Sequence, residues 1–129
     1  MPNGIWLSDT PSHCKLQGGL TLAVVVETLS NSTKCGGLTE AWRIGWMAYE
    51  HNILLVPHGW NTAVGLAADL QLSAALPVAR YVEYLTPTPY IDELITEPFK
   101  PDAEGCLTIP QKPGLGIELN REALKRFGT

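Results

Sequence analysis

Apolar side chains recur every three or four positions after the Gly-Gly turn at 36–37, and this spacing predicts an amphipathic helix. We expect the helix to begin with Thr39 as its N-cap and to end near His51. Residues 53–56 are then apolar at every position and are followed by a proline. Such a run is typical of a strand that is buried on both faces of a parallel sheet.

The same alternation occurs once more along the chain. Asn61 or Thr62 can cap a second helix, rich in Ala and Leu, that runs from about residue 63 to residue 76 and ends at a proline. Residues 80–84 then predict a second strand, with Glu83 near its end. The order helix, strand, helix, strand predicts an α/β architecture built on a parallel sheet.

The two ends of the chain carry weaker patterns. Residues 1–19 show neither a helical nor a strand period, and only residues 20–29, which are rich in Val and Leu, predict a strand. Beyond the second predicted strand, six prolines restrict regular structure to short pieces. We expect a hairpin near 106–109 and a helix over 121–127, capped by the asparagine before it.

Composition and charge limit the classes of partner. With 129 residues, 45% hydrophobic and 17% charged, the chain has the composition of one globular domain. Its formal net charge is −4, and no cluster of Lys and Arg interleaves with aromatic residues, so we expect no nucleic-acid partner. The longest apolar run, 20–26, is far shorter than the roughly 20 residues of a membrane helix, and the first residues lack a basic signal region. A cytoplasmic location without membrane attachment is therefore expected.

The three cysteines predict neither a disulfide framework nor a structural zinc site. Cys14, Cys35 and Cys106 are odd in number and widely spaced, without a Cys-x-x-Cys pair. Free cysteine usually behaves as a small hydrophobic residue. We therefore expect three buried, unreactive thiols.

Two residues stand where an α/β barrel usually carries its chemistry. His58 follows the first predicted strand, and Glu83 lies near the end of the second. In such barrels the reacting side chains stand at the C-terminal ends of the strands. Taken alone, a histidine after a strand is more often a structural hydrogen-bonding group, and an isolated glutamate is usually solvated. The pattern leaves catalytic and structural roles open.

Five short segments carry a further signal because of their order and spacing. They are Lys-Cys-Gly-Gly-Leu-Thr-Glu-Ala at 34–41, Val-Pro-His-Gly-Trp-Asn-Thr-Ala at 56–63, Leu-Ala-Ala at 66–68, Val-Glu-Tyr at 82–84 and Lys-Pro-Gly-Leu-Gly-Ile at 112–117. Together they resemble the enolase superfamily, and within it the mandelate racemase and muconate lactonizing enzyme family with its acid-sugar dehydratase branch. The resemblance covers 34–129, whereas a lead segment, 1–33, does not resemble the family.

The resemblance implies the C-terminal portion of a (β/α)-barrel, about its seventh and eighth strands with flanking helices, and therefore an incomplete barrel. In the complete family enzyme, Mg²⁺ binds the carboxylate of an acid sugar, a base removes the α-proton and the metal stabilises the enediolate. By this resemblance His58 is the base, or in dehydratases the acid that protonates the departing hydroxide, and Glu83 hydrogen-bonds the substrate carboxylate. Trp60 and Asn61 follow in a loop over the expected site, where substrate contact and packing both remain open.

Two departures from the family bear on activity. Asn31 stands where the family has an aspartate that pairs with the histidine, and an amide does not stabilise an imidazolium as a carboxylate does. Nothing before Lys34 resembles the carboxylates that hold Mg²⁺, so we assign no metal ligand in this chain. Loss of such electrostatic stabilisation costs on the order of several kcal/mol of barrier. We therefore expect no useful turnover from this polypeptide alone.

Two functions follow as hypotheses. The first is a truncated enolase-superfamily member, of the mandelate racemase or acid-sugar dehydratase type, that is inactive without the rest of the barrel. The alternative is a non-catalytic, self-associating binding or assembly module. In either case two or three barrel strands leave strand edges and apolar faces uncovered, so we expect a homo-oligomer.

Overall fold

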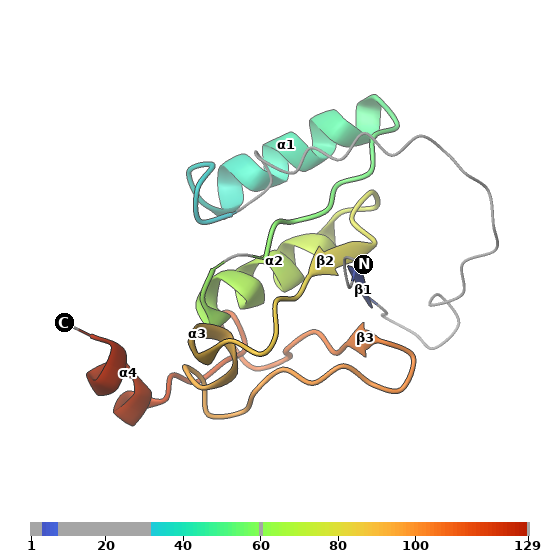
Figure 1. The fold of residues 1–129 in the computed structure, drawn as a ribbon. Coiled ribbons are helices and arrows are strands. Elements are labelled where there is room, and N and C mark those ends of the chain that lie inside the picture. The colour runs from blue at the N-terminus through green and yellow to red at the C-terminus, as the bar shows by residue number, and fades with distance from the viewer. Residues whose placement is uncertain (1–3, 8–31, 60, 129) are drawn as a thin grey trace.

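The structure, a computed structural model, describes residues 4–7, 32–59 and 61–128. Figure 1 shows α1 and α2 lying side by side, and α4 at the end of the molecule away from β3. Within these described ranges, no helix is long and apolar enough to cross a membrane. The elements in chain order are β1 (Gly4–Leu7), α1 (Leu38–Glu50), α2 (Ala63–Ala75), β2 (Tyr81–Glu83), α3 (Pro89–Asp92), β3 (Cys106–Leu107) and α4 (Arg121–Phe127).

α1 begins directly at the glycine turn and has no threonine cap. Gly36 and Gly37 have φ angles of 110° and 99°, a conformation that residues with side chains rarely adopt. Gly37 is the N-cap residue, and its carbonyl oxygen accepts from the backbone N–H of Ala41 (3.1 Å). Thr39 therefore lies within the first turn, and the prediction that it caps the helix is wrong. The predicted end near His51 is confirmed, because its backbone N–H closes the helix.

α2 is buried on nearly every side. The side chain of Thr62 accepts a hydrogen bond from the backbone N–H of Gly65 (3.4 Å), which confirms one of the two predicted caps. Every residue from Gly65 to Leu70 is buried, so this part of the helix packs against other elements on all its faces. It contributes to two clusters of the hydrophobic core. The first contains Leu66, Leu70, Val82, Tyr84, Ile91 and Leu107, and the second contains Ala41, Leu55, Leu72, Leu76 and Ala79.

The backbone at 55–57 runs parallel to the chain that enters β2. Leu55 and Ala79 form a parallel bridge, and farther along the backbone N–H of Glu83 donates to the carbonyl oxygen of Pro57 (3.2 Å). α2 thus connects two parallel stretches of chain, as the sequence predicts, but the first of them forms only the bridge at Leu55 and not the strand predicted over 53–56. Leu55 is 1% exposed but residues 53, 54 and 56 are half-buried. The prediction of a run buried on both faces is therefore wrong outside that one position.

β1 joins the sheet in a way that the sequence pattern does not predict. The strand order is β2-β1-β3, with Ile5 opposite Val82 in antiparallel register and Trp6 beside Cys106 in parallel register. β3 pairs with β1 rather than forming a hairpin, so the hairpin expected near residues 106–109 is wrong. β1 lies along an edge of β2. The strand expected at 20–29 lies outside the described residues.

Polar contacts and short helices organise the chain after β2. The Tyr84 hydroxyl lies 3.1 Å from Oδ1 of Asp92 and 2.9 Å from the carbonyl oxygen of Phe99, which ties the end of β2 to α3. α3 is an element that the sequence pattern does not predict. It begins with Pro89, a residue that suits a first turn because its missing N–H would have no helical partner there. α4 is confirmed, since the Asn120 side chain accepts from two backbone N–H groups of the first turn.

The cysteines differ from the three free thiols predicted. Cys35 is half-buried and free. Cys106 is 3% exposed and disulfide-bonded, so the prediction is wrong for this residue. Spacing along the chain does not show which thiols a fold brings within bonding distance. Cys14 lies outside the described residues.

Candidate functional site

His58 and Glu83 meet at the ends of two neighbouring parallel segments. His58 directly follows the segment 55–57, and Glu83 is the last residue of β2. The ring nitrogen Nε2 of His58 lies 3.7 Å from Oε2 of Glu83. The side chains are 28% and 35% exposed, so a ligand can reach both. The structure therefore brings together the two residues that the sequence analysis singled out.

Gly59 orients the carboxylate of Glu83. Its backbone N–H donates to Oε2 of Glu83 (3.2 Å), so this oxygen faces both the amide and the imidazole. A Cβ atom at position 59 would lie 2.0 Å from the carbonyl oxygen of Glu83. Because that obstacle is backbone, no rotamer change can relieve it. The close approach of the two chain segments requires glycine here.

Replacing Gly59 with Ala is expected to destabilise the protein by about 2 kcal/mol and to displace Glu83, because overpacking against backbone forces the strands apart. Urea unfolding measures the first effect. Gly45→Ala is the matched control, since the atoms nearest to its Cβ would all belong to the side chain of Leu76, which can move, and not to backbone. Equal stability losses for the two variants would contradict the structural reason given for Gly59.

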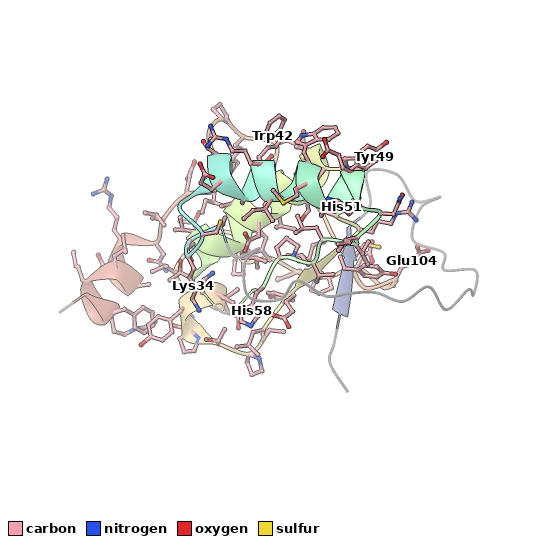
Figure 2. The ribbon with its side chains drawn as sticks, turned by 90° about the horizontal axis from the view of Figure 1, so that it is seen from above. Lys34, Trp42, Tyr49, His51, His58 and Glu104 are labelled. Carbon is pink, nitrogen blue, oxygen red and sulfur yellow. The ribbon has the colours of Figure 1, made fainter. Side chains whose placement is uncertain are left out.

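The distance between the two side chains defines what the site can do. At 3.7 Å, His58 and Glu83 are too far apart for a hydrogen bond but close enough for an ion pair when the imidazole is protonated. The pair thus combines a group that can accept or donate a proton with an adjacent carboxyl group. Figure 2 shows His58 on the side of the molecule away from Trp42 and Tyr49 of α1.

Asp69 is a third ionisable residue near this site, and the sequence pattern does not predict its role. Asp69 lies in α2 and is fully buried, at 0% exposed. Its Oδ1 accepts from the backbone N–H of Ser32 (3.3 Å). An Ala- and Leu-rich helix usually turns such a residue to solvent. The burial of Asp69 could have been predicted from the apolar residues on both sides of it in the sequence.

Burial raises the pKa of the Asp69 carboxyl from its ordinary value of 3.8 to about 6. Hydrogen bonding from Ser32 and the charge on His58 act in the opposite direction, but desolvation is the larger effect. A buried carboxyl group whose pKa is raised in this way is a candidate for a functional role.

The other predicted site residues are only partly described. Asn61 is half-buried, and its backbone N–H donates to the carbonyl oxygen of Gly59 (2.9 Å), so it lies in a tight turn after His58. Trp60 and Asn31 lie outside the described residues. Across 4–7, 32–59 and 61–128, no group of three or more His, Cys, Asp or Glu side chains could hold a metal ion.

Similarity to known proteins extends over most of the chain. Residues 25–123 match the family described as "Enolase C-terminal domain-like". D-galactarolactone cycloisomerase of Agrobacterium fabrum is 39% identical over 102 residues, which are 72% of this chain and 27% of that protein. Arabinonate dehydratase of Saccharolobus solfataricus is 32% identical over 92 residues, 71% of this chain and 24% of that protein. The chain thus spans about a quarter of the length of these curated relatives.

The fold of the chain is also similar to a solved structure from this group of proteins. The crystal structure of a mandelate racemase/muconate lactonizing enzyme from Sulfitobacter sp. is 32% identical, with a TM-score of 0.61 over 67% of this chain and 22% of that one. The β-α-β unit that carries His58 and Glu83 therefore corresponds to part of a (β/α)-barrel. On this evidence the chain belongs to the enolase superfamily, with relatives in its mandelate racemase and muconate lactonizing enzyme group.

Proposed function

We propose that the chain contributes the acid–base histidine and the carboxylate-binding glutamate to an enzyme that moves a proton next to the carboxylate of a sugar acid. The observation that carries this proposal is the 3.7 Å approach of His58 Nε2 and Glu83 Oε2 at the ends of adjacent parallel segments. Acidic side chains and histidines at such strand ends are where barrel enzymes place their chemistry. The family membership of the chain supports the same reaction class.

His58 is the proton-transfer group in this proposal. As a base, its Nε2 takes the proton from the carbon next to the carboxylate, and as an acid it returns a proton to a departing hydroxide. Glu83 binds the substrate carboxylate in its protonated form, by donating a hydrogen bond from its carboxyl O–H, because an ionised carboxylate has no donor. Because the two side chains are neighbours, a substrate held by Glu83 has its α-carbon within reach of His58. The reaction is then a racemisation, cycloisomerisation or dehydration, as the names of the relatives indicate.

The Mg²⁺ that the family resemblance implies does not fit the residues described here. Those residues contain no cluster of three or more His, Cys, Asp or Glu side chains that could hold a metal ion. We therefore assign no ligand and no step of the reaction to a metal in this part of the chain. When bound in a complete enzyme, the ion would supply charge stabilisation for the enediolate.

A segment exchange tests the proposal without requiring this polypeptide to work alone. The part of D-galactarolactone cycloisomerase that matches this chain is replaced with residues 25–123, and cycloisomerisation is measured against the parent enzyme. We expect the chimera to be slower than the parent and still active. A folded chimera that binds the substrate but shows no activity would contradict the proposal.

Self-association is the second candidate function, and α1 carries the observation that favours it. Its outer face exposes large apolar side chains, and the ring centroids of Trp46 lie 5.8 Å from Trp42 and 5.4 Å from Tyr49. Met47 is 62% exposed on the same helix. Figure 2 shows Trp42 and Tyr49 on the outer side of α1. A continuous apolar surface of this kind is typical of interfaces, and we propose that a second copy of the chain covers it.

Replacing Trp46 with Lys is expected to shift the chain to monomer, because a charge would have to be buried in the contact between copies. Sedimentation velocity at several concentrations measures the change. Leu119→Lys is the control, since Leu119 is also an exposed apolar residue but lies outside α1. If both variants sediment like the original chain, α1 is not the interface.

A further inference from the structure

The chain that leaves β2 folds back onto one side chain, Asp92 of α3. Oδ2 of Asp92 accepts hydrogen bonds from the backbone N–H of Thr88 (2.7 Å) and from the hydroxyl of Thr86 (3.1 Å). Its Oδ1 lies 3.1 Å from the hydroxyl of Tyr84, the residue that follows Glu83. One carboxylate therefore binds the chain at positions 84, 86 and 88, along the segment that Figure 1 shows running from β2 to α3.

Capping of α3 would need only one of these contacts. An acidic side chain near the start of a helix often accepts from the backbone N–H of the N-cap residue, as Asp92 does from Thr88. Such a contact acts on α3 alone. The contacts with Thr86 and Tyr84 are additional, and they connect α3 to the residue that adjoins Glu83.

Tyr84 is the link between Asp92 and the candidate site. It is 7% exposed and belongs with Val82 to the first cluster of the core. Because side chains alternate along an extended chain, those of Val82 and Tyr84 point into the core and that of Glu83 points to the opposite face. Burial raises the pKa of the Tyr84 hydroxyl from its ordinary value of 10.0, so the group keeps its proton at neutral pH and can donate it to Asp92.

The contacts of Glu83 make its position sensitive to a shift of Tyr84. The backbone N–H of Glu83 donates to the carbonyl oxygen of Pro57 (3.2 Å), and its Oε2 accepts from the backbone N–H of Gly59 (3.2 Å). A Cβ atom at Gly59 would lie 2.0 Å from the carbonyl oxygen of Glu83, which belongs to the peptide group shared with Tyr84. Movement of this peptide group would therefore change the contact between Glu83 and Gly59.

We propose that Asp92 is a positioning residue, which holds the carboxyl group of Glu83 beside Gly59 through the buried hydroxyl of Tyr84. This inference rests on the function proposed above, because it concerns the glutamate that binds the substrate carboxylate. A binding group is held in its productive geometry by supporting side chains that do not themselves touch the substrate. Asp92 has this supporting role and takes no part in proton transfer.

The backbone N–H of Gly59 reports the position of Glu83 in the folded chain, because it donates to the Glu83 carboxyl group. In ¹H–¹⁵N NMR spectra we expect Asp92→Ala to shift the Gly59 signal and to speed up its hydrogen exchange. Asp102→Ala is the matched control, since Asp102 also closes a turn, accepting from two backbone N–H groups within 102–106 (2.9 Å each). A Gly59 signal that moves equally in both variants, or in neither, would overturn the proposal.

Tyr84→Phe tests the same path without removing a carboxylate, because it deletes the hydroxyl and keeps the ring in the core. We expect this variant to shift the Gly59 signal in the same direction, and it keeps the test decisive if Asp92→Ala fails to fold. The double variant should shift the signal no further than Asp92→Ala alone, since both changes break one connection. Additive shifts would contradict the path through Tyr84.

The kinetics of the chimera separate positioning from a merely structural role. Asp92→Ala is expected to raise KM by roughly tenfold with kcat nearly unchanged, because Glu83 binds the substrate and Asp92 moves no proton. Asp102→Ala should leave both constants unaltered, and an unchanged KM in Asp92→Ala would overturn the positioning role. If the chimera is inactive but Asp92→Ala still shifts the Gly59 signal, the proposed function fails and the positioning of Glu83 stands.

Discussion

His58→Gln in the chimeric cycloisomerase is expected to lower kcat/KM by about 100- to 10,000-fold, the usual contribution of a general acid or base. The imidazole stands 3.7 Å from Glu83 and is 28% exposed, so the substitution removes the proton-transfer group without opening the core. Steady-state kinetics of the chimera measures the loss. His51→Gln provides the control, because the same change at the end of α1 should leave kcat/KM unaltered.

Glu83→Gln separates binding from proton transfer in the same chimera. The glutamine side chain keeps the shape of Glu83 but replaces its carboxyl group with an amide, so the hydrogen bond to the substrate carboxylate has a different donor. The loss should therefore fall between those of His51→Gln and His58→Gln. A His58→Gln chimera that retains the kcat/KM of the unsubstituted chimera would contradict the role assigned to the histidine.

Asp69→Asn is expected to stabilise the protein above about pH 6, contrary to the usual effect of changing a buried residue. The pKa of Asp69 is raised from 3.8 in the unfolded chain to about 6 in the folded one, so folding favours the protonated acid. The stability contributed by this group is fully present below pH 3.8 and is lost as the pH rises through 6. The loss amounts to about 3 kcal/mol.

The asparagine variant removes this loss and retains most contacts. Its amide oxygen can accept from the backbone N–H of Ser32, as Oδ1 of Asp69 does, and its NH₂ group carries no charge. Urea unfolding at pH 4, 6 and 8 should show a falling stability in the original chain and a flatter profile in Asp69→Asn. Glu104→Gln, at an exposed carboxylate, is the control. Parallel pH profiles for all three proteins would contradict the burial of an ionising Asp69.

Local patterns in the sequence predict the part of the fold that carries the site. α2 begins at the predicted Thr62 cap, and Glu83 ends the predicted second strand, because caps and apolar runs are local signals. The meeting of His58 and Glu83 follows from the predicted apolar run before His58 and the predicted strand that carries Glu83, since the ends of neighbouring parallel strands lie together. Their catalytic roles stay predictions.

Contacts between distant residues explain what the sequence does not predict. β1 is defined only by its pairing with β2 and β3, and no periodicity in residues 1–19 predicts a strand there. Asp69 differs from an ordinary surface aspartate because the part of α2 that carries it is buried, at every residue from Gly65 to Leu70. Thr39 has the chemistry of a cap, but Gly36 and Gly37 allow the helix to begin two residues earlier, with Gly37 as the N-cap. The preferences of residues for the N-cap position do not decide between Gly37 and Thr39.

Solvent exchange of the substrate's α-hydrogen tests the central claim most directly, because it reports proton transfer and needs no complete reaction. The chimera that contains residues 25–123 is incubated with substrate in D₂O, and deuterium at the α-carbon is followed by ¹H NMR. We expect exchange in the chimera and its loss in the His58→Gln variant. Exchange at the same rate in both proteins would contradict the assignment of His58 as the proton-transfer residue.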